Sequence, residues 1–204
     1  MKDTKRLTFR KWQESDIGAV LAGLSENGKA NGVARNIGIV GNFTEEHAKS
    51  YMAEAFLRSA ITYAIALKND DGTEGEVIGG TDIYWDAENK IKNSSNLWIN
   101  HDAKYQNRGY GAEAYIEQVR YCFDELGATE MYERHLASNS VSERMQKKLG
   151  YKPVAKEIKF FGVEDVDVII SHLTKEDFHA ALEKRKHLIE RLQGKKNKIE
   201  DAGV

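Results

Sequence analysis

The stretch Gln106-Asn107-Arg108-Gly109-Tyr110-Gly111 holds the residue types that bind a phosphate group. It follows a short apolar run, Leu97-Trp98-Ile99, and precedes a long amphipathic segment, so it lies between a predicted strand and a predicted helix. Glycine lets a backbone approach a ligand closely. The first N–H groups of a helix have no partner within the helix and attract anions. The stretch therefore predicts a phosphate site built from backbone N–H groups.

Further along the chain lie three side chains that could move protons, together with an asparagine. Glu133 and His135 fall on a predicted strand, and Asn139 and Ser142 fall at the start of the helix that follows it. Carboxylates and imidazoles act as general bases, and a hydroxyl can donate a proton to a leaving group. Structural roles stay open at the same positions, because Asn and Ser also cap helices and a strand histidine is more often structural than catalytic.

The spacing of apolar residues predicts the elements that position these groups. Ala112–Leu126 has its apolar side chains along one helix face, and Gly127 follows as a C-cap. In chain order the pattern reads β-α-α-β-β-β-α-β-α-β-β-α. Strands gather in the middle and alternate with helices afterwards, which predicts an α/β (α+β) fold with a mixed sheet. Residues 26–43 are rich in glycine and are expected to form a long functional loop.

Bulk composition narrows the classes of function. The chain has 204 residues and a net charge of −2, which argues against a nucleic-acid binder driven by bulk charge. Cys122 is the only cysteine, and it lies on the apolar side of its helix, where packing is its expected role. No apolar stretch is long enough for a membrane span and no signal sequence precedes the first strand, so a cytoplasmic protein is expected. We expect one domain over 1–174 and an amphipathic helix with a polar tail over 175–204.

Three motifs in order resemble those of the GNAT N-acetyltransferase superfamily, and within it the RimJ/RimL-type ribosomal-protein N-terminal acetyltransferases. The cofactor signature of that family, Gln/Arg-x-x-Gly-x-Gly/Ala, is matched in full by residues 106–111. Asn139-Ser-Val-Ser142 and Leu149-Gly150-Tyr151 match the two motifs that follow it. The opening Leu7-Thr-Phe-Arg10 also fits, and the resemblance runs from about Arg6 to about Leu173.

The resemblance implies a GNAT-like central, mostly antiparallel sheet flanked by helices, and acetyl-CoA as the acyl donor, with no metal. It implies that the donor's pyrophosphate lies on backbone N–H groups and that its pantetheine arm runs beside a strand. The implied cofactor-binding residues are Ile99, Asn100, His101, Gln106, Asn107, Arg108, Gly109, Tyr110, Gly111, Ala112, Asn139 and Ser142. The acceptor would be a primary amine, either a peptide N-terminus or a small molecule, that attacks the thioester directly. The sequence leaves a homodimer open and predicts no membrane partner.

The catalytic residues are less clearly marked, because the chain departs from the family pattern. Where RimJ/RimL-type proteins often carry a Glu before the cofactor loop, this chain has Ser95-Asn96, and Gln146 replaces a tyrosine found in some relatives. The candidate catalytic residues are Ser142, as a donor to the leaving thiolate, with His135 and Glu133 as bases. His101, Asp82 and a water relay are the alternatives for the base.

Other functions remain as competitors. A non-catalytic CoA-binding sensor or scaffold would keep the same fold without the base. Gly109-Tyr-Gly111-Ala-Glu-Ala114 also spells the dinucleotide pattern G-x-G-x-x-A, with Glu133 about where a ribose-binding acid is expected. That pattern requires its first glycine directly after a strand, and the polar stretch 100–108 intervenes here. A nucleic-acid module using the basic C-terminal residues is a third, minor option.

Overall fold

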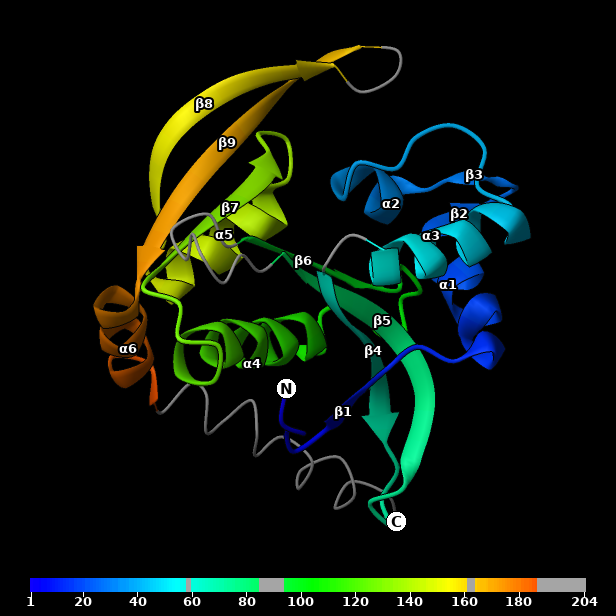
Figure 1. Ribbon diagram of the computed structural model, residues 1–204, viewed down its shortest axis with the longest axis horizontal. Coiled ribbons are helices and arrows are strands. Elements are labelled where there is room, and N and C mark those ends of the chain that lie inside the picture. The colour runs from blue at the N-terminus through cyan, green and yellow to red at the C-terminus, as the bar shows by residue number, and fades with distance from the viewer. Residues whose placement is uncertain (58–59, 85–93, 161–163, 187–204) are drawn as a thin grey trace, which may run out of the picture.

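The computed structural model describes residues 1–57, 60–84, 94–160 and 164–186. Two sheets lie side by side with helices on both faces (Figure 1). The first has the order β1-β4-β5-β6 and is antiparallel throughout, and the second has the order β7-β9-β8. Their strands are β1 (Leu7–Arg10), β4 (Ala60–Lys68), β5 (Glu74–Tyr84), β6 (Ser94–Ile99), β7 (Glu130–Leu136), β8 (Lys152–Phe160) and β9 (Asp165–Thr174). This mixed, mostly antiparallel architecture confirms the predicted fold class.

Helices cover the two faces of these sheets with separate apolar clusters. On one side, here called the α3 face, α1 (Ile17–Leu24) and α3 (Glu45–Leu57) pack on Trp98 and Ala64 of the first sheet. On the other side, called the α4 face, α4 (Tyr110–Asp124) and α5 (Ser140–Leu149) share one cluster with Ile83 and Met131. The helix α6 (Lys175–Glu183) joins that second cluster through Phe178.

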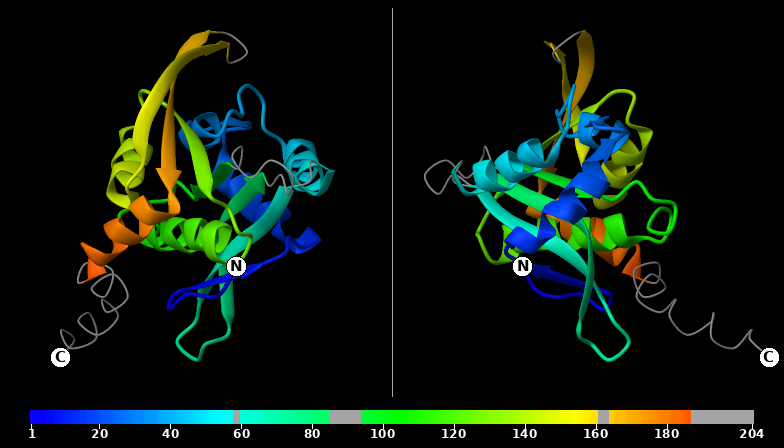
Figure 2. Two further views of the ribbon diagram at one scale, coloured as in Figure 1. Left: turned by 60° about the vertical axis from the view of Figure 1, so that its left-hand side comes forward. Right: turned by 90° about the vertical axis from the view of Figure 1, so that its right-hand side faces the viewer.

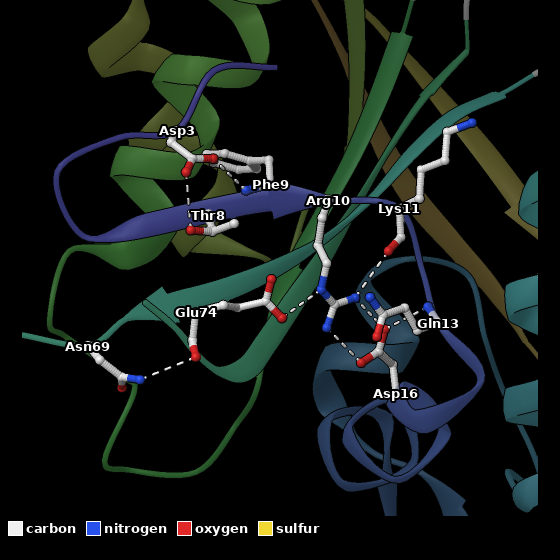
Figure 3. A network of polar contacts seen from close by, with 9 residues as sticks. All are labelled: Asp3, Thr8, Phe9, Arg10, Lys11, Gln13, Asp16, Asn69 and Glu74. Atoms are coloured by element: carbon white, nitrogen blue, oxygen red, sulfur yellow. Dashed lines mark hydrogen bonds and ion pairs between the residues drawn. The ribbon is translucent and has the colours of Figure 1, made fainter. Parts of the chain in front are cut away.

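The entry into α1 is fastened by one arginine, which Figure 3 shows from close by. The Arg10 guanidinium donates two hydrogen bonds to the Asp16 carboxylate, 2.6 and 2.9 Å long. Its Nε donates to Glu74 on β5 at 2.7 Å. Asp16 is buried and also accepts from the Gln13 N–H, at 2.8 Å. The two-pronged Arg–carboxylate contact fixes α1 relative to β1 and β5 at once.

The two sheets meet at β6 and β7 without a backbone ladder among the described residues. At the near end of this gap, the Glu133 carboxylate of β7 accepts hydrogen bonds from the N–H of Ser95, at 3.0 Å, and from the Ser95 hydroxyl. A side chain thus replaces the backbone pairing that would otherwise join the two strands. Beyond this contact the strands β6 and β7 diverge (Figure 1), and the line along which they lie unpaired is here called the seam.

Residues 26–43 differ from the predicted loop, because short strands and a helix interrupt it. They contain a two-stranded sheet, β2 (Ser25–Glu26) with β3 (Lys29–Ala30), and the short helix α2 (Gly32–Asn36). The Asn31 side chain caps α2 by accepting from the N–H groups of Val33 and Ala34. Elements of two to five residues are too short to show periodicity in a sequence, so the prediction of a loop was wrong.

Two expectations about the C-terminal part of the chain stay predictions. The helix α6 begins at Lys175, and the domain boundary at 174 stays a prediction. Residues 187–204, which include the predicted polar tail, lie outside the described residues, so that expectation stays a prediction.

The hairpin β8–β9 extends away from the body of the molecule, as both views in Figure 2 show. Its tip is joined to α2 by an ion pair between Glu164 and Arg35. Among the described residues, no helix is long and apolar enough to cross a membrane.

Candidate active site

The loop from β6 to α4 is held in shape by its own side chains. The Asn100 side-chain oxygen accepts from the Asp102 N–H at 3.0 Å, which makes a tight turn. The Gln106 side chain donates to the Asn100 carbonyl at 2.6 Å. Asn107 has φ 58° and Gly109 has φ 83°, so both adopt the left-handed conformation that Gly and Asn tolerate. Gln106 therefore braces the loop through its side chain.

Gly109 is the N-cap of α4, and the N–H groups of Tyr110, Gly111 and Ala112 open the helix. Among the described residues, no carbonyl or side chain accepts a hydrogen bond from these three groups. They form the free end of a helix of 15 residues, where the dipole favours an anion. A Cβ at Gly111 would meet Ile99 and Met145 at 3.6 Å, an ordinary contact, which agrees with the Gly/Ala alternative of the motif.

A buried ion pair that no local sequence pattern indicates stabilises this helix end. The Arg6 guanidinium donates to Glu113 at 2.7 Å and to the Arg108 carbonyl at 2.9 Å. Glu113 also accepts from the Thr4 hydroxyl at 2.6 Å. The N-terminal segment thus holds both the first turn of α4 and the loop before it. More than a hundred residues separate the partners in the chain, so local patterns carry no signal of this contact.

The strand β6 offers backbone groups to the open seam. Asn100 N–H donates to the Ile78 carbonyl at 2.7 Å, and the even-numbered residues of β6 therefore pair with β5. The N–H and C=O groups of Leu97 and Ile99 consequently point toward β7, where no ladder forms among the described residues. Of the predicted backbone contacts, Ile99 has free groups, whereas the N–H and carbonyl of Asn100 are already bonded.

Asn139 and Ser142 lie together at the N-terminus of α5, on the α4 face. The Asn139 side-chain oxygen accepts from the Ser142 N–H at 3.1 Å, so Asn139 is a helix N-cap. Its side-chain nitrogen donates to the Ser142 hydroxyl oxygen at 3.0 Å. Because that oxygen already accepts one bond, the hydroxyl proton is directed toward another acceptor. The predicted pair is therefore assembled, and its two residues contact each other.

Glu133 and His135 also face the α4 side, since they lie two and four residues after Met131 of the core and a strand repeats its face every two residues. Glu133 is 3% exposed, and burial raises the pKa of its carboxyl to about 8, although the bonds from Ser95 oppose this shift. Burial lowers the pKa of His135, which lies beside Gln146 of α5. His135 Nδ1 and Gln146 Oε1 are buried and have no hydrogen-bond partner among the described residues.

Asp82 lies on the opposite, α3 face and forms a chain of polar contacts that sequence patterns did not indicate. The Tyr51 hydroxyl of α3 donates to Asp82 Oδ2 at 3.0 Å, and the Trp98 indole N–H donates to Tyr51 at 3.0 Å. Asp82 Oδ1 is buried and has no partner among the described residues. Burial raises the pKa of the Asp82 carboxyl to about 6, while the Tyr51 bond lowers it. This is the state of a group that can exchange a proton near neutral pH.

His101 completes the set of predicted residues and lies apart from the others. It follows β6, and its Nδ1 lies 3.0 Å from the Asn31 side-chain nitrogen at the start of α2. Asn31 donates in addition to the Gly23 carbonyl, at 2.9 Å. His101 thus contacts the N-cap residue of α2, and that residue in turn bonds α1.

The residues around the seam suit an acyl-CoA. The free N-terminus of α4 suits a pyrophosphate, and the edge groups of Leu97 and Ile99 suit the amides of an extended arm. Residues 6–152 match the sequence profile described as an acetyltransferase (GNAT) domain. The chain belongs to the GNAT family. This GNAT protein is accordingly an N-acetyltransferase, and the family uses acetyl-CoA as its acyl donor.

Solved structures share the fold of this GNAT protein at low sequence identity. A GNAT acetyltransferase from Bacillus anthracis has a TM-score of 0.70 at 21% identity, covering 86% of this chain and 98% of that one. A proposed ribosomal-protein-serine acetyltransferase from Vibrio cholerae gives 0.65 at 18%, covering 84% and 95%. The spermidine N-acetyltransferase of Vibrio cholerae in complex with CoA and spermine gives 0.66 at 11%, covering 86% and 99%. A search of curated proteins found no match.

Proposed function

We propose that this N-acetyltransferase acetylates a primary amine that approaches from the α3 face, and that Tyr51 and Asp82 take up the proton of that amine. The single observation that supports the base is the buried Asp82 carboxylate, whose Oδ1 is unpartnered among the described residues. Acetyl-CoA would supply the activated acetyl group, held by residues 107–112 and by the free edge of β6. A peptide N-terminus and a small amine both fit this reaction.

In this proposal the acyl donor lies on the α4 face and the amine approaches from the α3 face. Both helix N-termini that suit the acyl donor, those of α4 and α5, lie on the α4 face, with Asn139 and Ser142. The amine must then reach the same carbonyl from the other side, where Asp82 and Tyr51 lie. Asp82 pairs in register with Asn96, next to the Leu97 N–H that points into the seam. That N–H is a suitable donor to the oxyanion that develops during attack.

The proton path follows from the hydrogen bonds. The Tyr51 oxygen accepts from Trp98, donates to Asp82 and keeps one lone pair for an incoming N–H. As the amine attacks, Tyr51 can take its proton while passing its own to Asp82. Ser142, whose oxygen accepts from Asn139, is the proposed donor to the leaving thiolate. Glu133 and His135, on the α4 face, are assigned structural roles: Glu133 positions Ser95, and His135 packs beside Gln146.

Direct transfer is favoured over an acetyl-enzyme because the chain lacks a suitable thiol. Cys122 is the only cysteine, it is fully buried, and burial raises the pKa of its thiol. Double-reciprocal plots of initial velocity against acetyl-CoA, at several fixed amine concentrations, should therefore give intersecting lines. Incubation with acetyl-CoA alone should leave the mass of the protein unchanged. Parallel lines together with a stable acetyl-protein would contradict direct attack.

The role of Asp82 is tested by Asp82→Asn, which keeps the size of the side chain and its bond with Tyr51 but removes the base. We expect turnover to fall by about 100-fold, within the usual range for a general base, while the affinity for acetyl-CoA stays the same. Glu133→Gln is the matched control on the other face, and it should lose much less. A wild-type rate in Asp82→Asn would remove Asp82 from the mechanism.

A further inference from the structure

Arg134 is an exposed arginine on β7 that points away from α4 and α5. Its neighbours Glu133 and His135 are buried on the α4 face, so alternation along the strand places Arg134 on the α3 face. Among the described residues, its side chain makes no hydrogen bond or ion pair. By contrast, the other described arginines of residues 6–152, except Arg108 in the phosphate loop, bond an acid or a hydroxyl through their side chains.

Arg134 lies at the same level of the sheets as the proposed base. The bond between Ser95 and Glu133 ties β7 to β6, and Asn96 and Arg134 directly follow these two partners in the chain. Asn96 pairs in register with Asp82 on β5. Neighbouring strands are about 4.8 Å apart, so the backbones of Asp82 and Arg134 lie at least about 10 Å apart on one face. A carboxylate and a guanidinium therefore flank the point where the amine must enter.

The surroundings of Arg134 favour a tight contact with an anion. Its register partner on β9 is Ile170, which is buried, and the next residues on the same face, Leu136 and Val168, are buried and apolar. The acid on this face of β7, Glu130, is already bonded to His172 and Tyr132. An ionic contact beside apolar side chains is less screened by water than one in open solvent.

We propose that Arg134 binds a carboxylate of the acceptor, so that the preferred substrates are small amino-carboxylates such as free amino acids. This inference rests on the proposed function, because it concerns the same amine site. The planar guanidinium can form two parallel hydrogen bonds with a carboxylate, which fixes direction as well as distance. Asp82 repels the carboxylate end and attracts the ammonium end, so the two charges orient the acceptor with its amine toward the seam.

The test compares acceptors that differ only in this charge. Initial rates are measured with α-amino acids and their carboxamides, with ω-amino acids of longer spacing, with a polyamine and with neutral alkylamines. We expect at least one amino acid to exceed its own carboxamide in kcat/KM by about 10-fold or more, the usual value of a charged hydrogen bond. Arg134→Gln should raise KM for that acid by a similar factor, leave the carboxamide unchanged and leave KM for acetyl-CoA unchanged.

Two variants serve as controls. Arg134→Lys keeps the charge without the two-pronged geometry and should recover part of the loss. Lys49→Gln removes one positive charge from the exposed surface of α3, where Lys49 pairs with Glu45. This variant should leave KM for every acceptor unchanged.

The outcomes separate the two proposals. The carboxylate site would be overturned if carboxamides, neutral amines or polyamines reached the same kcat/KM as the acids and Arg134→Gln left KM for the acids unchanged. Amine acetylation would still stand in that case. A failure of every amine in the panel, with acetyl-CoA still bound, would overturn the proposed function and this inference with it.

Discussion

Four acidic or basic side chains near the seam differ in what surrounds them, and these differences decide what each can do. Glu133 is tied to Ser95 and protonated near neutral pH, and His135 lies against Gln146. His101 contacts Asn31 on the other side of the loop. Asp82 has a free oxygen, a hydroxyl bridge and a pKa raised to about 6. The residue types could be selected from the sequence, but the sequence did not rank them, because burial and facing depend on the register between strands.

The pH profile of the reaction tests the proton path at this scale. The amine must be neutral and Asp82 must be ionised, so the logarithm of kcat/KM should rise with a slope of two below about pH 6 and of one above it. The Tyr51 bond lowers the pKa of Asp82, so Tyr51→Phe should move the lower break to higher pH and reduce the rate.

Two acceptors with different amine pKa values separate the two ionisations. The upper break should follow the amine, and the lower break should stay the same for both. Asp82→Asn should keep a slope of one throughout. An unchanged lower break in Asp82→Asn would assign that ionisation to another group.

Gly109 tests the phosphate site at the same scale. Gly109→Glu would place a carboxylate at the free end of α4 and should weaken the binding of CoA by 100-fold or more, measured by calorimetry. Gly109→Asn, which tolerates the left-handed conformation found there, should bind within about 10-fold of the wild type. Equal affinities for the glutamate and asparagine variants would place the phosphates elsewhere.

At the scale of elements, long strands and helices followed from their patterns, whereas contacts between them did not. The predicted helix Ala112–Leu126 and the observed α4 differ by about two residues at each end, because helical spacing extends over several turns there. The short elements in 26–43 were missed, although Asn31 before Gly32 is an N-cap signal that could have indicated α2. The Arg6–Glu113 pair joins distant segments and has no local signature.

The N-cap of α5 gives a prediction for one element. Asn139→Ala removes the acceptor for the Ser142 N–H and the donor to the Ser142 hydroxyl, so it should lower the free energy of unfolding by about 1 kcal/mol, measured with urea. It should also lower turnover, because Ser142 loses its orientation. Ser142→Ala keeps the cap and should lower turnover with little change in stability. Loss of stability without loss of turnover in Asn139→Ala would reduce this pair to a cap.

At the scale of the whole molecule, two sheets are joined at one end of their seam by a buried acid rather than by a ladder. Glu133 holds its proton up to about pH 8 in the folded protein, whereas an exposed glutamate loses it near 4.5. The folded state therefore binds more protons than the unfolded state between these values. The stability that this proton contributes is complete below about pH 4.5 and is lost as the pH rises to about 8.

Unfolding measured with urea from pH 5 to pH 8.5 should show this loss, of the order of a few kcal/mol. Asp82 shifts in the same direction up to about pH 6, so the wild type alone does not isolate Glu133. Glu133→Gln has no proton to lose and should be less dependent on pH, with the difference from the wild type changing steadily between pH 5 and about pH 8. Parallel curves for the wild type and this variant would show that Glu133 is not protonated at the seam.

The central claim is that acetyl-CoA lies in the seam between β6 and β7 and leaves its carbonyl open to the α3 face. A crystal structure of the protein with acetyl-CoA tests it most directly. We expect the pyrophosphate on the N–H groups of Gly109 to Ala112, the pantetheine amides on the edge groups of Ile99 and Leu97, and the Tyr51 hydroxyl facing the thioester from the α3 side. A donor bound on the α3 face, or a thioester that is closed off from Tyr51 and Asp82, would contradict the account.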